Sequence, residues 1–201
     1  MVSQLMDNCL EFLKSRRSIR RFRRDSPPLD LILKAIDVAR YAPSARNSQP
    51  WRFIVVNDPS LKNKLAEIHP WARPLKEAPI GVVVACHIDE SPTSYMLDCA
   101  NATIYLLLAL HALGLGAVWI QALRNVEELR ELLGIPNNAI PVAVIAIGYP
   151  DEKPEPRPRR PIGEVVFLNK YGSKFIVMKN IIDMDKYLGM EVQCKLQPPR
   201  F

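Results

Sequence analysis

A short run of small and polar residues between two prolines has the composition of a binding loop. Residues 43–53 read Pro-Ser-Ala-Arg-Asn-Ser-Gln-Pro-Trp-Arg-Phe, and the chain continues directly into Ile-Val-Val. Such a run is too polar for a core, and the prolines at its ends restrict its conformations. Its two amide side chains each offer a hydrogen-bond donor and an acceptor. We therefore predict a rigid polar loop that binds a flat heterocycle through Pro43, Ser44, Ala45, Asn47 and Gln49.

Arginines cluster at two other places, and both clusters could bind a phosphate group. The first cluster contains Arg16, Arg17, Ser18 and Arg20. A guanidinium group matches phosphate oxygens with two parallel N–H donors. The second cluster lies in the segment Arg-Pro-Arg-Arg-Pro at 157–161, where either Arg159 or Arg160 is the candidate. Arginine runs are also common on solvated surfaces, so the alternative for each cluster is an exposed face or a soluble spacer.

The order of these elements resembles that of the FMN-dependent nitroreductase family. The family element Arg-Arg-Ser-x-Arg-x-Phe is matched at 16–22, and Ala-Pro-Ser-x-x-Asn-x-Gln-Pro-Trp-x-Phe is matched at 42–53. A Gly-Leu-Gly segment at 114–116 follows a long apolar stretch, and a Gly-Tyr-Pro segment at 148–150 ends a later strand. The resemblance covers roughly residues 8–172. Four elements in this order are far more specific than any one of them.

The resemblance implies a fold and a cofactor. The fold would be α+β, with a mixed, mainly antiparallel sheet flanked by helices, in an intertwined homodimer that binds FMN at the subunit interface. The first arginine cluster and a basic residue of the late cluster would bind the FMN phosphate, and the polar loop would line the isoalloxazine ring. A backbone N–H from the segment between Gly116 and Gln121, which includes Ile120, would approach flavin N5.

The resemblance also implies a reaction. NAD(P)H would reduce FMN, and a nitroaromatic, a quinone or a free flavin would reoxidise it in a ping-pong mechanism. Because the flavin carries the redox chemistry, no catalytic side chain and no metal site are predicted. The first alternative keeps the fold and FMN but cleaves reduced flavin or removes halogen from an aromatic substrate, under a lid at 69–78. A remote alternative is a basic nucleic-acid-binding protein, which the net charge and the arginine clusters alone support.

Composition and charge fit a globular enzyme. The chain has 201 residues, of which 48% are apolar, and a formal charge of +6. The basic residues concentrate at 14–24 and 153–160 and form no stripe along a helix, so we predict no nucleic-acid partner. The uncharged stretch at 102–123 is interrupted by two glycines, so we predict a core helix followed by a strand and no membrane contact.

Cysteine usage bears on location. No Cys-x-x-Cys pair is present, and Cys86 and Cys99 lie in apolar stretches where we predict buried thiols. This usage fits a reducing compartment, and we expect the protein in the cytoplasm.

Helical and strand patterns alternate along the chain. A helix is predicted after Ser26 as N-cap and Pro27 as first residue, with Leu29 and Leu33 among its buried positions. Residues 1–172 would form one domain, and 173–201 an extension that packs on its own or a partner subunit. Further helices are predicted at 3–15, 60–68, 93–113 and 125–133, and strands at 51–56, 80–87, 117–120 and 139–147.

Overall fold

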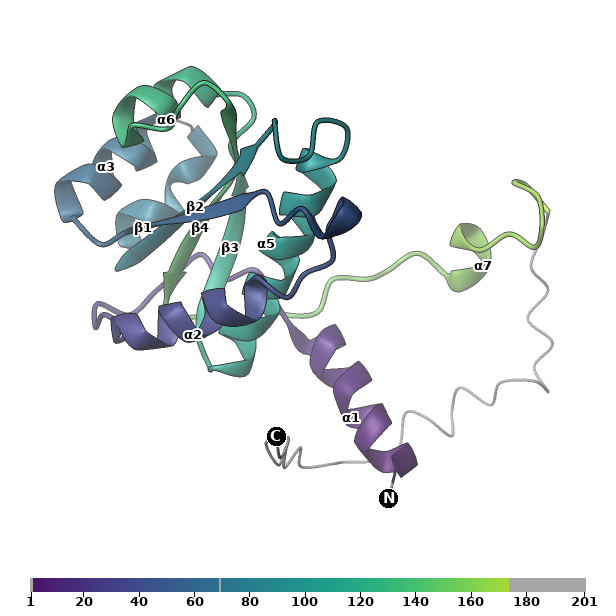
Figure 1. The fold of residues 1–201 in the computed structure, drawn as a ribbon. Helices are drawn as coiled ribbons and strands as arrows, with labels where there is room; N and C mark the ends of the chain where they lie inside the picture. Colours follow the sequence, from purple (N-terminus) through teal and green to yellow (C-terminus); the bar gives the residue numbers. More distant parts are fainter. Residues whose placement is uncertain (1, 69, 174–201) are drawn as a thin grey trace, which may run out of the picture. The chain divides into compact units, whose positions relative to one another are not determined.

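The computed structural model describes residues 2–68 and 70–173 of the chain. These residues divide into two compact units, which we describe separately. The larger unit runs from Arg17 to Pro154 and contains the sheet (Figure 1). The smaller unit combines the chain up to Arg16 with the chain from Glu155 onward.

Four antiparallel strands form the sheet of the larger unit. They are β1 (Trp51–Val56), β2 (Ile80–His87), β3 (Gly116–Gln121) and β4 (Ala139–Gly148), in the order β1-β2-β4-β3. The predicted strands are therefore confirmed, including the internal position of the apolar strand β2. The only parallel pairing among the described residues is an isolated bridge between Ser18 and Ala117.

Both faces of the sheet are covered by helices, because side chains alternate between the two faces of a strand. On β2, Val82 and Val84 face a core shared with α2 (Leu29–Ala39) and α5 (Tyr95–Ala112). The residue between them, Val83, faces a second core. That second core includes side chains from α3 (Pro59–Ile68), α4 (Pro74–Glu77) and α6 (Val126–Leu133). Figure 1 shows the resulting three layers, which confirm the predicted α+β class.

Helix α5 is the long core helix that the sequence predicts. By length and composition it could cross a membrane, but Cys99, Ala102, Leu106 and Leu110 are fully buried in the core between the helix and the sheet. The helix ends where Gly114 adopts a left-handed conformation with φ of 74°. The N–H of Leu115 then donates to the carbonyl of Leu110 at 2.9 Å, which satisfies one of the last helical carbonyls.

Helix α2 begins later than the sequence predicts. Its N-cap is Pro28, and no side chain caps it, so Ser26 is not the N-cap. The reason is local: Pro27 precedes another proline, which disfavours the helical conformation at Pro27. In the single chain, Leu29 and Leu33 are 46% and 54% exposed, so the prediction that they are buried is wrong.

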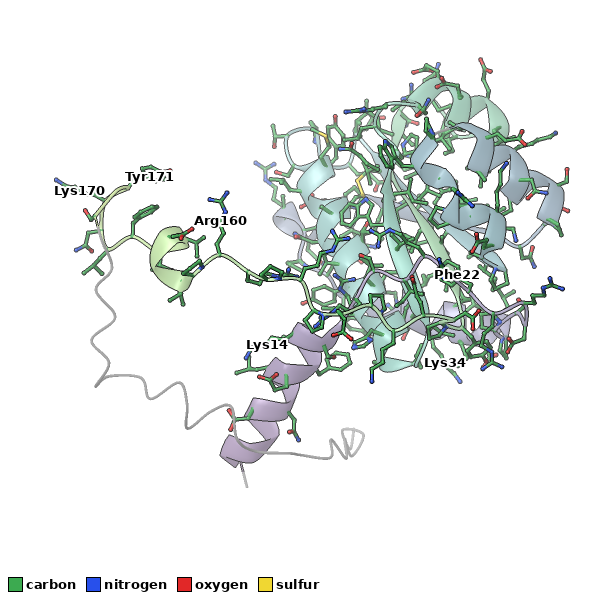
Figure 2. The ribbon with its side chains drawn as sticks, turned by 180° about the vertical axis from the view of Figure 1, so that it is seen from behind. Lys14, Phe22, Lys34, Arg160, Lys170 and Tyr171 are labelled. Atoms are coloured by element: carbon green, nitrogen blue, oxygen red, sulfur yellow. A yellow bond between two sulfur atoms is a disulfide. The ribbon has the colours of Figure 1, made fainter. Side chains whose placement is uncertain are left out.

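A disulfide joins Cys86 on β2 to Cys99 on α5, with their Cα atoms 6.1 Å apart (Figure 2). Both residues are buried, as predicted, but they are not free thiols. The sequence shows two apolar stretches that each contain a cysteine. Only the packing of α5 on the sheet places the two sulfur atoms within bonding distance.

The described residues of the smaller unit form the helices α1 (Val2–Ser15) and α7 (Ile162–Val165). Helix α1 confirms the predicted N-terminal helix. The proline-rich segment at 155–161 has no regular secondary structure, as predicted. The predicted C-terminal extension lies outside the described residues apart from residue 173, so its packing and the domain boundary stay predictions.

Candidate functional site

The first arginine motif runs beside strand β3. Ser18 bridges Ala117, and the N–H of Ile19 donates to the carbonyl of Ala117 at 3.0 Å. Gly116 makes this approach possible, because a Cβ atom at this position would lie 2.8 Å from Ile19 Cγ2. Gly116 is therefore the first residue of β3 and is not part of the turn after the long helix. Because Gly116 has no side chain, the arginine motif can pack against the edge of the sheet. The turn lies at Gly114, whose φ is 74°.

A glutamate holds the same motif from the other side. Glu152 Oε1 accepts hydrogen bonds from the backbone N–H groups of Arg20 and Arg21, at 2.5 and 3.1 Å. Beyond them, Phe22 is buried and bridges Pro150. The backbone of the motif is thus fixed by bonds to segments far away in sequence, while the side chain of Arg20 stays exposed.

A pocket of about 300 Å³ lies beside β3. This pocket brings together two of the predicted cofactor residues, Arg20 from the first motif and Ile120 from the strand. It has two guanidinium groups and two indole rings in its lining, which suits a flat, anionic ligand. The lining residues are Arg20, Trp71, Pro74, Val118, Trp119, Ile120, Gln121 and Arg124.

Three lining residues of this pocket, Trp71, Trp119 and Arg124, are not among the predicted cofactor-binding residues. Trp71, in the short 3₁₀ turn Pro70–Ala72, is 76% exposed and lies within the segment predicted as a lid. Trp119 and Arg124 follow from no motif; they could have been found only from their place on and after the strand that carries Ile120. Trp119 and Gln121 also line a neighbouring pocket of about 290 Å³ with Met96, Ala100, Leu123 and Val142.

The polar loop has an unusual backbone. Its centre is a 3₁₀ turn, Ala45–Asn47, and Arg46, Asn47 and Gln49 have φ angles of 56°, 56° and 49°. Residues other than glycine rarely adopt this left-handed region, at a cost of about 1–3 kcal/mol each. Such conformations persist only where the surrounding structure enforces them, and they concentrate at functional sites.

Two residues of α5 hold this loop, and sequence reasoning misses both. Asp98 is 3% exposed, and its Oδ1 accepts the N–H of Ala45 at 3.0 Å. Asn101 donates from Nδ2 to the carbonyl of Pro43 at 3.1 Å. Within the loop, Ser44 Oγ accepts the N–H of Gln49 at 3.1 Å. An acidic residue inside the apolar pattern of α5 is the one signal that could have pointed to Asp98.

The predicted site residues therefore form two groups in the larger unit. Arg20 and Ile120 line the pocket beside β3, where Ser18 and Gly116 also lie. The loop residues Pro43, Ser44, Ala45, Asn47 and Gln49 lie together beside α5, and none of them lines that pocket. The structure of one chain brings each group together but does not join the two groups around one pocket.

The remaining predicted phosphate ligands are divided between the two units. Arg17 belongs to the larger unit, whereas Arg16, Arg159 and Arg160 belong to the smaller one. Both late arginines are exposed, and Arg159 Nη1 donates to the nearby carbonyl of Arg157 at 3.1 Å. Their contact with a phosphate stays a prediction.

Two titratable groups outside the site have shifted pKa values. Burial lowers the pKa of Lys62 on α3, whose ammonium donates to the carbonyl of Ala78. A hydrogen bond to Asp37 raises the pKa of Arg40, with their ion pair at 2.6 Å. Neither residue lines the pocket, and we assign no functional role to either pKa shift.

Comparison with known proteins extends these observations. The Nitroreductase family profile matches residues 13–90 and 70–149. A Methanothermobacter thermautotrophicus protein with the provisional name NADH dehydrogenase/NAD(P)H nitroreductase is 42% identical over 153 residues, 74% of this chain and 80% of the relative. An iodotyrosine deiodinase from Thermotoga neapolitana is 30% identical over 182 residues, 78% of this chain and 94% of the relative.

Solved structures have the same fold. The crystal structure of a Parabacteroides distasonis protein, provisionally named NADH dehydrogenase/NAD(P)H nitroreductase, is 34% identical, with a TM-score of 0.78 over 82% of this chain and 99% of that one. An FMN-dependent nitroreductase from Clostridium difficile is 29% identical, with a TM-score of 0.75 over 81% of this chain and 99% of that one. With the matched profile, these similarities show that the chain belongs to the nitroreductase family of oxidoreductases.

Proposed function

We propose that the protein is an FMN-dependent oxidoreductase that takes electrons from NAD(P)H and passes them to a small organic acceptor such as a nitroaromatic, a quinone or a free flavin. When bound, FMN would supply the redox chemistry, accepting a hydride from NAD(P)H and then reducing the acceptor in a ping-pong cycle. The protein's own contribution would be to bind the cofactor, orient it and shape the space for two substrates that enter in turn.

The pocket beside β3 is the observation that carries this proposal. Its lining includes Arg20, from the motif that we assign to the FMN phosphate, and Ile120, from the segment that we assign to flavin N5. Beyond the bridge at Ala117, no further strand of the described chain pairs with the outer edge of β3. Backbone N–H groups on this edge could therefore donate to a ligand in the pocket.

The residues around the pocket and the loop fit FMN. Arg16, Arg17, Ser18 and Arg20 would bind the phosphate and its neighbourhood, with Arg159 or Arg160 added from the late segment. Gly116 would contribute by admitting the arginine motif to β3. The pyrimidine edge of the ring carries carbonyl and N–H groups, which Pro43, Ser44, Ala45, Asn47 and Gln49 could meet with backbone and amide groups.

We propose that the active form is an intertwined homodimer in which the polar loop of one subunit completes the pocket of its partner. The separation of the two groups of site residues within one chain supports this arrangement. Exposed leucines support it too, because Leu33 on α2 and Leu97 on α5 are 54% and 69% exposed. Isolated exposed leucines are common, but these helices pack on each other and share one face of the sheet.

The same proposal sets the partners and the location. We place the enzyme in the cytoplasm, where NAD(P)H is available, with small molecules as its substrates. Cysteine usage no longer supports this location, because Cys86 and Cys99 form a disulfide and disulfides are rare in reducing compartments. We propose no nucleic-acid partner, because the arginines that raise the net charge are assigned to a phosphate-bearing cofactor.

The visible absorption spectrum of the purified protein tests the proposal. We expect a yellow protein that releases close to one FMN per chain on heating, identified by mass, and that bleaches when NADH or NADPH is added without oxygen. A colourless protein that does not bind added FMN would overturn the proposal, and the arginine motif would then have to bind another anion.

A second candidate is reductive dehalogenation with the same cofactor, because the Thermotoga relative is named an iodotyrosine deiodinase. Anaerobic incubation of the reduced enzyme with 3-iodotyrosine and with a nitroaromatic separates the two functions. Release of iodide at a rate above that of nitro reduction would favour the second candidate. Nitro reduction without iodide release would favour the first.

A further inference from the structure

The strained polar loop is held by a buried carboxylate to which no motif assigns a role. We propose that Asp98 is a positioning residue that fixes the loop at 44–49 and, through it, the surface that receives the isoalloxazine ring. The second half of this statement rests on the proposed function, whereas the first half concerns the loop alone.

The loop does not hold its conformation by itself. Its internal hydrogen bonds are local: the N–H of Asn47 donates to the carbonyl of Ser44 at 3.1 Å, and the N–H of Ser48 to that of Ala45 at 3.0 Å. Bonds of this kind are equally available to turns without left-handed residues. Three left-handed residues other than glycine together cost several kcal/mol, at about 1–3 kcal/mol each, so contacts from outside the loop must offset that cost.

Asp98 supplies the strongest of these outside contacts. One carboxylate oxygen accepts the N–H of Ala45 at 3.0 Å, and the other accepts the hydroxyl of Ser91 at 2.7 Å. Both Asp98 and Ser91 are buried, and no salt bridge involves Asp98 in the part of the chain that the structure describes. The charge is therefore directed at a peptide N–H and a hydroxyl, and such charge-assisted bonds are about twice as strong as neutral ones.

Asp98 is itself held in a rigid frame. The next residue, Cys99, is bonded to Cys86 on β2. The residue after Cys86, His87, donates its N–H to the carbonyl of Pro50 at 2.8 Å. The frame of β2 and α5 thus contacts the loop near both of its ends, through Asp98 at Ala45 and through His87 at Pro50. Removing the Asp98 bond should loosen the loop at Ala45, while Asn101 still holds Pro43 and His87 still holds Pro50.

The test compares substitutions at Asp98 with a matched substitution on the same helix. Asp98→Ala removes the acceptor, whereas Asp98→Asn keeps an oxygen that can accept the N–H of Ala45. Thr103→Val is the control, because Thr103 is fully buried on α5 and its hydroxyl donates to the carbonyl of Cys99 and not to the loop. Each variant is assayed for FMN affinity by fluorescence quenching and for cleavage by trypsin after Arg46 in the absence of FMN.

We expect Asp98→Ala to raise the Kd for FMN about 10- to 100-fold, as for the loss of a hydrogen bond to a charged group. We also expect trypsin to cut after Arg46 about tenfold faster or more, because the loop opens more often. Asp98→Asn should restore most of both properties. Thr103→Val should lower thermal stability and leave both properties at their wild-type values, which separates positioning from a general loss of stability.

The outcomes separate this proposal from the proposed function. If wild-type protein does not bind FMN, the proposed function fails, and the trypsin comparison alone decides the role of Asp98. If Asp98→Ala is cut at the wild-type rate and binds FMN normally, the proposal is wrong. If Asp98→Ala does not fold, Ala45→Pro removes the same hydrogen bond from the exposed loop side, at the first residue of the 3₁₀ turn, where proline is tolerated. Normal trypsin resistance in Ala45→Pro would also overturn the proposal.

Discussion

The polar loop at 44–49 and the proline-rich segment at 155–161 are both predicted to touch the same cofactor, but they are held in different ways. The loop is bonded to the frame of β2 and α5 by contacts that span large sequence separations, such as Ala45 to Asp98. Within the described residues, Arg159 donates hydrogen bonds to the nearby carbonyls of Arg157 and Pro158. A loop that is already ordered loses little entropy on binding, whereas a locally bonded segment must be ordered by the ligand.

The first arginine motif belongs with the loop in this comparison. Its backbone is bonded to Ala117 on one side and to Glu152 on the other. We therefore expect most of the binding free energy for the cofactor to depend on the motif and the loop, and less of it on the late arginines. Four predictions test this ranking, from the largest expected effect to the smallest.

Replacing both Arg16 and Arg20 by alanine should abolish cofactor retention. Each guanidinium can make charge-assisted bonds to a phosphate or ring oxygen worth about 1.5–3 kcal/mol, so the Kd for FMN should rise about 100-fold or more. Fluorescence quenching measures the Kd, and circular dichroism checks the fold. The matched control is Arg23→Ala with Arg24→Ala, which removes the same charge just outside the motif. A double variant at Arg16 and Arg20 that keeps its FMN would show that the first arginine motif does not supply most of the binding free energy.

Replacing both Cys86 and Cys99 by alanine should destabilise the frame behind the loop. The disulfide closes a segment with a sequence separation of 13, and loop-closure entropy then predicts a loss of about 3 kcal/mol in the free energy of unfolding. Denaturant unfolding measures this loss. Cys9→Ala is the control, because Cys9 is an exposed free thiol. Unchanged stability of the double variant would mean that core packing alone holds α5 to β2.

Glu152→Ala should weaken cofactor binding about tenfold without removing any residue that would contact FMN. The substitution leaves the N–H groups of Arg20 and Arg21 without their acceptor, so the arginine motif loses one of the contacts that hold its backbone. Glu152→Gln keeps an acceptor oxygen and should recover most of the affinity. Equal affinities for the wild type and Glu152→Ala would show that the bridges of the motif to Ala117 and Pro150 are sufficient.

Arg159→Ala and Arg160→Ala should each change the Kd for FMN only about two- to fivefold, the range of an exposed ion pair. The effect should shrink further as salt is raised, because exposed charges are screened. Titrations at low and high salt, with Arg157→Ala as the neighbouring control, measure it. A loss for either variant larger than that for Glu152→Ala would reverse the ranking of the two regions.

Local sequence patterns were sufficient for the elements and for the residue types of the site. The apolar runs of β2 and β4, the helix before Gly114 and the order of the motifs each depend on residues close together in the chain. The resemblance to the nitroreductase family rests on such local motifs, and the matched profile confirms it. Local patterns also failed at the start of α2. Ser26 and Pro27 resemble an N-cap and a first helical residue, but the second proline disfavours a helical conformation at Pro27, so the helix begins later.

Sequence alone thus determined the strands, the main helices, the family and the residue types that could bind a phosphate and a flat ring, because these depend on short-range periodicity and on motif order. Only the tertiary structure decided the pairing of Cys86 with Cys99, the anchoring of the loop by Asp98 and of the arginine motif by Glu152, and the presence of Trp71 and Arg124 beside Arg20. Each of these joins residues distant in sequence, and such contacts exist only once the helices have packed on the sheet.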